Sequence, residues 1–184
     1  MPAEPREIDT VRTDGMPLVH VSTATEAFRG QDGGMATHDY ETSLEWTGST
    51  AAGYRAYDRA HAVTVGATPM TLSADAPFRG DPSLPNPEQL LLAAASSCQL
   101  LSFLALAALE RVDVIRYEDS AHAVMPQGDG PTRITEITLR PTITVRGTDE
   151  GTARALLERA HEQCYIANTL TADVQLDASI EVAA

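Results

Sequence analysis

The sequence predicts an α+β domain in which a mostly antiparallel sheet packs against two helices. Three observations support this fold class. Segments of alternating apolar and polar residues, typical of strands, flank a long apolar stretch at residues 90–109. A second helical pattern follows residue 148, with its apolar residues on one face. The expected order of three strands, a helix, two strands, a helix and a strand is typical of the α+β class.

The first 34 residues are expected to lie outside the folded domain. Residues 1–34 are rich in Gly, Pro, Thr and charge, which predicts a loosely held N-terminal arm. Met35 directly precedes the first clear strand and is a candidate natural start, so the domain is expected to span residues 35–184. No charged segment followed by a long apolar run opens the chain, and we expect a cytoplasmic protein.

Three strands are expected before the first helix. Apolar and polar residues alternate along residues 40–47, as in a half-buried strand. A turn at residues 48–53 leads into a second strand over residues 54–65. A short third strand covers residues 69–73, and a loop with several prolines follows over residues 76–85.

The first helix has a clear start signal. Asn86 is a suitable N-cap, Pro87 suits the first helical position, and Glu88 adds negative charge to the first turn. Apolar residues then occupy every face as far as Leu109, which predicts a centrally buried helix. The stretch is long enough to span a membrane, but its many small residues and Gln99 favour a helix buried in protein.

Further strands and a second helix are expected in the C-terminal half. Residues 114–125 and 133–145 form strand patterns, and an imperfect alternation predicts a bulge or bend near Pro141. The last strand is expected over residues 174–182. The second helix begins near residue 148 or 149 and places the following residues on one face: Ala153, Leu156, Leu157, Ala160 and Cys164.

The charge balance argues against two classes of partner. Thirteen Lys and Arg face 26 Asp and Glu, a formal net charge of −13. Such a surface repels phosphate backbones and anionic lipids, so we expect neither nucleic acid nor membrane as a partner.

Two cysteines, Cys98 and Cys164, are the first candidates for chemistry. Without a secretory signal they are unlike a structural disulfide framework, and three alternatives remain: buried thiols, a redox pair, or part of a metal site. Both lie on the inner faces of the two helices, where packing can bring them together. Ser96 and Ser97 interrupt the apolar helix together with Gln99, which indicates that this region faces a pocket. His161 and Cys164 form an H-x-x-C pair, but structural zinc needs about four ligands, and we expect no metal.

A reactive cysteine thiolate needs a cation beside it. Cys98 lies too deep in its helix for the N-terminal dipole to help, and the arginines that precede the helix are the candidates: Arg55, Arg59 and Arg79. Glu88 is ten residues before Cys98, about 15 Å along a helix. If arginine, carboxylate and thiol form one site, the carboxylate is expected from a second subunit. On spacing alone, Glu88 is simply a residue of the first helical turn.

The segment NPEQLLLAAASSC, residues 86–98, resembles the OsmC/Ohr hydroperoxide reductases, with the same interval from Glu88 to Cys98. Cys164 follows 66 residues later in HEQCYIANTL, which is similar to the second cysteine motif of that family. The resemblance covers residues 40–184. Two departures are Tyr165, where many members have proline, and Tyr54-Arg55-Ala56-Tyr57 in place of a glycine-rich turn.

This resemblance implies an intertwined OsmC-like homodimer with active sites at the interface. It implies that Cys98 is the peroxidatic cysteine, Cys164 the resolving cysteine, and Glu88 the carboxylate that orients a catalytic arginine. Arg55 matches that arginine best by position, and Arg59 is the second choice. The resemblance also implies no bound cofactor and an external dithiol reductant of the lipoyl type.

The expected function is therefore thiol-dependent reduction of organic hydroperoxides to alcohols through a Cys98–Cys164 disulfide. One alternative is a non-catalytic relative that binds an apolar ligand at the dimer interface. A zinc-bound binding module is a third and weaker reading.

Overall fold

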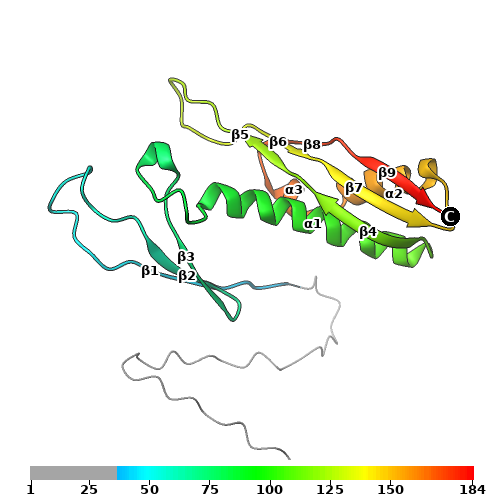
Figure 1. The fold of residues 1–184 in the computed structure, drawn as a ribbon, viewed down its shortest axis with the longest axis horizontal. Helices are drawn as coiled ribbons and strands as arrows, with labels where there is room; N and C mark the ends of the chain where they lie inside the picture. Colours follow the sequence, from blue (N-terminus) through cyan, green and yellow to red (C-terminus); the bar gives the residue numbers. More distant parts are fainter. Residues whose placement is uncertain (1–36) are drawn as a thin grey trace, which may run out of the picture. The chain divides into compact units, whose positions relative to one another are not determined.

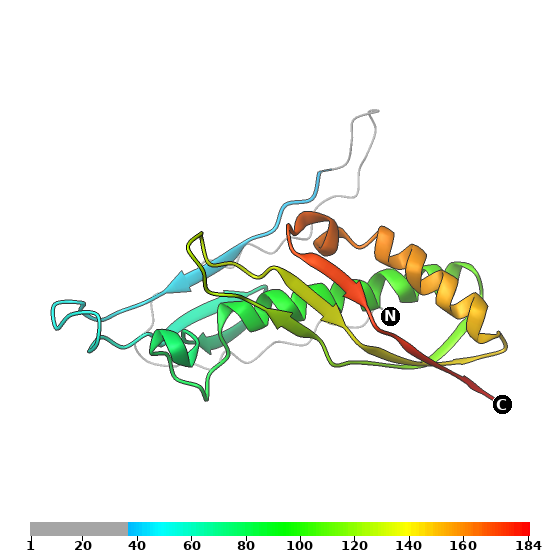
Figure 2. The ribbon, with the colours of Figure 1, turned by 90° about the horizontal axis from the view of Figure 1, so that it is seen from above.

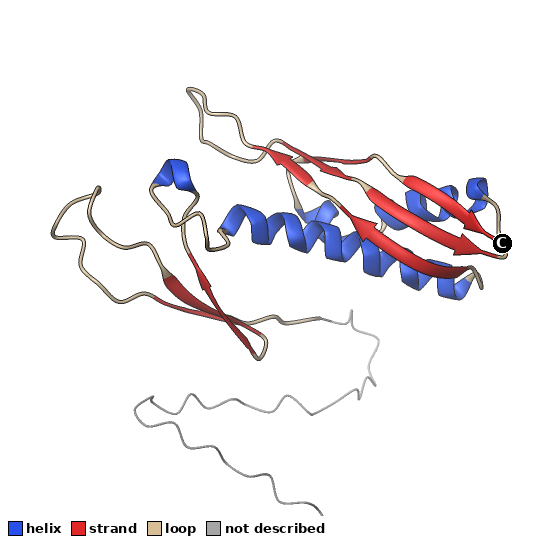
Figure 3. Ribbon diagram, viewed as in Figure 1, coloured by secondary structure: helices blue, strands red, loops and turns tan. Residues whose placement is uncertain are grey.

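The computed structural model describes residues 37–184 (Figure 1). The expected arm at residues 1–34 and the candidate start at Met35 lie outside the described residues. Residues Tyr40–Ala184 form one compact unit. The predicted α+β class is confirmed, with strands and helices in the following order (Figure 3): β1 Thr42–Glu45, β2 His61–Val65, β3 Thr68–Leu72, a 3-10 helix Ala76–Phe78, α1 Pro87–Leu109, β4 Asp113–Asp119, β5 His122–Val124, β6 Glu136–Leu139, β7 Pro141–Arg146, α2 Glu150–Glu162, α3 Tyr165–Thr169, β8 Asp173–Leu176 and β9 Ser179–Ala183.

The first three strands form an antiparallel sheet in the order β1-β2-β3. The predicted second strand was too long, because β2 begins at His61 and not at residue 54. The preceding residues turn instead, with Gly53 in the left-handed region at φ 86°. Asp58 fixes the end of this loop, since its carboxylate accepts from the Ala60 amide and its carbonyl accepts from Trp46 Nε1, each at 2.9 Å.

Helix α1 begins where the sequence predicts. Asn86 and Gln89 form a capping box, in which each side chain accepts a hydrogen bond from the backbone amide of the other. The prediction of burial on every face was wrong for the single chain. Only the face of Ala95, Gln99, Phe103 and Ala107 is fully buried, and the following residues remain largely exposed: Leu101 at 62% and Leu109 at 79%. By length and composition α1 could cross a membrane, a weak criterion that core helices of soluble proteins also meet.

The remaining strands form two further three-stranded sheets, in the orders β4-β7-β9 and β5-β6-β8. The sheet is thus divided, and it is mixed, because β6–β8 and β7–β9 pair in parallel. Four of the six strand pairs are antiparallel. The irregularity expected near Pro141 appears as a break between β6 and β7, while the register shift lies between Val114 and Arg116 of β4.

Helices α1 and α2 pack side by side along the sheet β4-β7-β9 (Figures 1 and 2). Asp149 caps α2, since its carboxylate accepts from the Thr152 amide at 3.0 Å. The buried core joins the two helices to β7 and β9 through one cluster: Phe103, Ile143, Val145, Ala153, Leu156, Leu157, Ala160 and Ile180. The segment after Cys164 forms the five-residue helix α3.

Candidate functional site

The two cysteines meet where α1 packs against α3. Cys98 is half-buried on α1, and Cys164 is fully buried directly before α3. The backbone amide of Ile166 donates a hydrogen bond to Cys98 Sγ at 3.5 Å. Cys164 is a close neighbour, because the Cys98 thiol is one of the groups that raise the pKa of the Cys164 thiol. The fold therefore brings together two free thiols that lie 66 residues apart in the sequence.

The two thiols differ in their surroundings. Burial raises the pKa of the Cys164 thiol to about 11, more than a hydrogen bond with the Ala167 backbone lowers it. Contact with Cys98 adds to the rise. Cys164 is therefore held protonated near neutral pH. Cys98, in contrast, is partly accessible from outside.

An open, largely apolar pocket of about 820 Å³ leads to Cys98. Its walls include Leu101, Ala105 and Leu109 of α1, and Tyr165 and Ile166 of α3. Ser97 lines it as expected, whereas Gln99 faces the protein interior. Tyr165, which follows the second cysteine, is 81% exposed at this pocket. None of the residues that line the pocket carries a positive charge.

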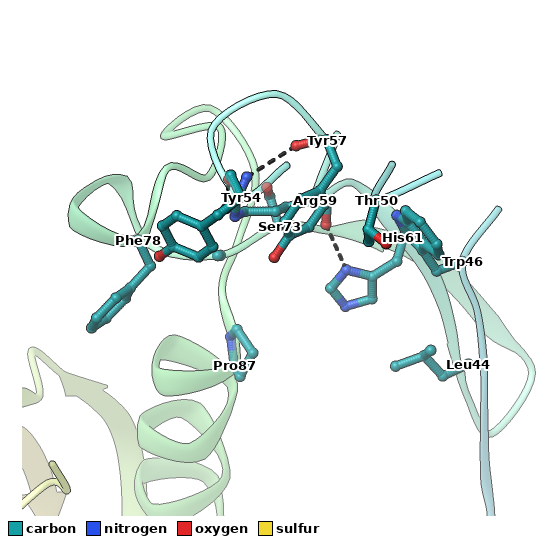
Figure 4. A pocket seen from close by; sticks show the side chains of 11 residues that line it. Leu44, Trp46, Thr50, Tyr54, Tyr57, Arg59, His61, Ser73, Phe78 and Pro87 are labelled. Atoms are coloured by element: carbon teal, nitrogen blue, oxygen red, sulfur yellow. Dashed lines mark hydrogen bonds between the residues drawn. The ribbon is translucent and has the colours of Figure 1, made fainter. Parts of the chain in front are cut away.

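The candidate arginines lie apart from Cys98 in this single chain. Arg55 is exposed in a turn. Arg59 instead lines a second pocket, of about 480 Å³, together with four aromatic side chains: Trp46, Tyr54, Tyr57 and Phe78 (Figure 4). The Arg59 guanidinium lies 3.9 Å from the centroid of the Tyr57 ring and 4.9 Å from that of Tyr54. It also donates to the carbonyl oxygens of both tyrosines, at 2.8 and 2.9 Å.

Arg59 is thus rigidly held, and no carboxylate pairs with it among residues 37–184. By position in the sequence, Arg55 is the preferred match to the catalytic arginine and Arg59 the second choice. Of Arg55 and Arg59, it is Arg59 that lines this pocket, which makes it a candidate for the cation of a site. The tyrosines that precede Arg59 in the sequence, Tyr54 and Tyr57, are the pattern from which this pocket could have been predicted.

Glu88 lies in the first turn of α1, as predicted. One of its carboxylate oxygens, Oε2, is buried without a hydrogen-bond partner in the described part of the chain. A buried carboxylate without a partner costs free energy, so an unpartnered oxygen is unusual. The neighbouring Pro87 lines the Arg59 pocket, which places the acid and the cation near the same end of α1.

A polar pair that the sequence did not reveal lies beside the cysteines. Gln99, fully buried, contacts His161 Nδ1 through its Oε1 at 3.0 Å, and His161 Nε2 lies 3.0 Å from the Val174 carbonyl oxygen. Both ring nitrogens of His161 are therefore engaged away from the Cys164 sulfur. In residues 37–184 no three His, Cys, Asp or Glu side chains are grouped to hold a metal ion.

The chain resembles several solved structures. A Vibrio cholerae OsmC-like protein of unknown function is 27% identical, with a TM-score of 0.69, over 77% of this chain and 99% of that one. A Legionella pneumophila organic hydroperoxide resistance protein is 18% identical, with a TM-score of 0.57, over 80% of this chain and 99% of that one. An organic hydroperoxide resistance protein of Bacillus subtilis is 18% identical, with a TM-score of 0.53, over 79% and 100%.

The sequence comparisons point the same way. Among curated proteins none matches the chain. The family model described as OsmC-like protein matches residues 80–179, more than half of the chain, and this range includes both cysteines and Glu88. The chain therefore belongs to the OsmC-like family.

Proposed function

We propose that this protein is a thiol-dependent peroxidase that reduces organic hydroperoxides to alcohols. The observation that carries this proposal is the pairing of an accessible thiol, Cys98, with a buried thiol, Cys164, at the end of an apolar pocket. An apolar approach suits the organic group of a hydroperoxide. The family includes organic hydroperoxide resistance proteins, which supports the same reading.

The first chemical step takes place at Cys98. Its thiolate attacks the terminal oxygen of the hydroperoxide, the O–O bond breaks, and the organic alkoxide takes up a proton and leaves as the alcohol. Cys98 is oxidised to a sulfenic acid and the peroxide is reduced. The Ile166 amide, which already donates to Cys98 Sγ, stabilises the negative charge on this sulfur.

The second step closes a disulfide. The Cys164 sulfur attacks the sulfenic sulfur of Cys98, the S–O bond breaks, and water leaves with the Cys164 proton. An external dithiol then reduces the disulfide by thiol exchange and is itself oxidised. We propose a lipoyl-type dithiol for this role. No bound cofactor takes part in this cycle.

A second copy of the chain would complete the site. Arg59 and Glu88 lie near the start of α1, and Cys98 lies ten residues beyond Glu88, about 15 Å along the helix. The face of α1 that carries Leu101 and Leu109 is apolar and exposed, next to the Cys98 pocket. In a homodimer with this face buried, the Arg59 and Glu88 of one subunit can approach the Cys98 of the other. Arg59 would then stabilise the thiolate, and Glu88 would orient Arg59.

One observation favours a different function. The Arg59 pocket is lined by Trp46, Tyr54, Tyr57 and Phe78, and such an aromatic pocket suits an apolar ligand that is bound but not transformed. On this alternative, the protein is a binding module that kept the family fold.

Hydroperoxide consumption separates these functions. Purified protein is mixed with a small dithiol and either cumene hydroperoxide or hydrogen peroxide, with Cys98→Ser as the matched variant. We expect faster consumption of the organic substrate by the unaltered protein and none above background by the variant. If fully reduced, folded protein consumes neither peroxide, even with dihydrolipoamide, the binding function becomes the better proposal.

A further inference from the structure

A buried hydrogen-bond pair connects the two cysteine-bearing segments. Gln99 directly follows Cys98 on α1, and His161 lies on α2, three residues before Cys164. Gln99 Oε1 is 3.0 Å from His161 Nδ1, and Gln99 Nε2 donates to the Leu157 carbonyl oxygen of α2 at 3.4 Å. The other ring nitrogen of His161 contacts the Val174 carbonyl oxygen of β8 at 3.0 Å.

Gln99 is an unusual residue for its position. Its side chain is fully buried on the same face of α1 as Ala95, Phe103 and Ala107, where an apolar residue of similar size would fit without any need for partners. A buried amide is tolerated only when hydrogen bonds replace those it made with water. Gln99 Oε1 and the Val174 carbonyl oxygen can only accept, so each of these contacts is a hydrogen bond when the ring nitrogen that faces it carries a proton.

The backbone of His161 continues the connection to the second cysteine. The His161 carbonyl oxygen accepts a hydrogen bond from the Cys164 amide at 3.1 Å. The same residue therefore contacts the neighbour of Cys98 through its ring and Cys164 through its backbone. Fixing His161 against α1 fixes the spacing between the two cysteines.

We propose that Gln99 and His161 are positioning residues that hold Cys98 and Cys164 at the separation needed for disulfide formation. A disulfide forms only when the two Cα atoms lie about 4.4–6.8 Å apart with suitable side-chain directions. The bond is made and broken in each cycle, so the two segments must keep this geometry when no covalent link joins them. The buried pair does so without taking part in the sulfur chemistry. The inference rests on the disulfide of the proposed function, but not on hydroperoxide as its oxidant.

The test measures disulfide formation in glutathione redox buffers, which need no peroxidase activity. The variants are Gln99→Leu, which keeps the volume and removes the amide, and His161→Leu, which removes the imidazole ring of its half-buried partner. The matched controls are Gln127→Leu and His38→Ala, both at exposed positions. We expect each test variant to lower the equilibrium constant for the Cys98–Cys164 disulfide about tenfold, as loss of one buried hydrogen bond implies. The controls should stay unchanged.

Two further measurements separate positioning from general loss of structure. The double variant should lose no more than either single variant, because each removes the same pair. With cumene hydroperoxide, Gln99→Leu should form the Cys98 sulfenic acid at the normal rate and close the disulfide slowly. Equal slowing of both steps, or a disulfide equilibrium unchanged in both variants, overturns the proposal.

The outcomes also distinguish this inference from the proposed function. If the unaltered protein forms the disulfide in glutathione buffer and both variants weaken it, the positioning role is supported even when no hydroperoxide is consumed. If the unaltered protein forms no Cys98–Cys164 disulfide in any buffer, the positioning role is overturned.

Discussion

The Ile166 backbone amide donates a hydrogen bond to Cys98 Sγ across 68 positions of sequence. This contact exists because α3 begins directly after Cys164 and packs on α1. It gives Cys98 a donor that stabilises a negative sulfur, while Cys164 has its charged form disfavoured by burial. The environment thus separates a thiol suited to react first from one suited to react second.

Replacing Cys164 by serine removes the second thiol and leaves the Ile166 donor in place. We expect Cys164→Ser to reduce one equivalent of cumene hydroperoxide at close to the normal rate and then to stop. With excess peroxide, Cys98 should progress to the sulfinic acid, because no thiol traps the sulfenic acid. Mass spectrometry of the protein after stepwise addition of peroxide measures this. Sustained turnover by the variant with a small dithiol would contradict a resolving role for Cys164.

The rate of disulfide closure should depend on pH. With a pKa of about 11, Cys164 is almost entirely protonated at pH 7, and its thiolate fraction rises about tenfold for each pH unit up to that value. Stopped-flow measurement of closure after one equivalent of hydroperoxide should therefore show a rate that increases from pH 7 to pH 10. A flat profile would mean that a neighbouring group removes the proton within the complex.

The same pKa affects stability at high pH. Because the folded value exceeds the ordinary value of 9.0, the protonated thiol favours the folded state, and this contribution is complete below about pH 9. It is lost as the pH rises through 11. Reduced Cys164→Ser should therefore lose less stability than the unaltered protein between pH 9 and pH 11, as measured by denaturant unfolding.

Arg59 and Arg55 should differ in their effect on activity. Arg59 is held over two tyrosine rings in a pocket, whereas Arg55 is exposed in a turn. If Arg59 stabilises the reacting sulfur and oxygen, Arg59→Gln should lower kcat/KM for cumene hydroperoxide by about 100-fold to 1000-fold. Arg55→Gln is the matched control and should change it less than threefold, since an exposed charge contributes little. The reverse order would restore the choice made from sequence position.

The sequence predicted the elements whose signals are local. The Asn86 cap and the proline after it define the start of α1, and the apolar face from Ala153 to Ala160 defines α2. The loop before β2 was missed because its conformation depends on contacts that no periodicity records. These contacts are the Arg59 bonds to the Tyr54 and Tyr57 carbonyls. The parallel pairs β6–β8 and β7–β9 depend likewise on long-range packing.

The candidate site, like the fold, was predictable from the sequence only where the signal is local. Cys98 and Cys164 could be named as candidates from their places on the two expected helices, whereas Glu88 could be named only from the resemblance of residues 86–98 to the OsmC/Ohr family. The partner of Gln99 could not, because His161 comes from a helix 62 positions away. Choosing between Arg55 and Arg59 likewise required the fold, because the two lie in one loop and differ only in which side chain turns toward the pocket.

The exposed face of α1 should be a dimer interface. Leu101 is 62% exposed and lies beside the Cys98 pocket, and burial of such a residue favours association. We expect Leu101→Glu to convert the proposed dimer to monomers and to reduce peroxidase activity at the same time, because in that dimer the second subunit would complete the site. Light scattering after size-exclusion chromatography measures the mass. Val182→Glu, which adds the same charge at a half-exposed position of β9, is the control and should remain dimeric.

If Glu88 orients Arg59 as we propose, its replacement should lower activity. Its buried Oε2 has no partner within the described chain, and in the proposed site a donor from another subunit, such as its Arg59, would satisfy this oxygen. Glu88→Gln keeps the size and removes the charge, so we expect kcat/KM for cumene hydroperoxide to fall about tenfold or more. In combination with Arg59→Gln the further loss should be small, because both changes act on one interaction.

Exposed Glu158 on α2 provides a matched control, Glu158→Gln, that should leave activity unchanged. If Glu88→Gln instead retains full activity and raises the denaturant midpoint, the carboxylate has no such donor, and Arg59 must be oriented by the two tyrosine carbonyls alone.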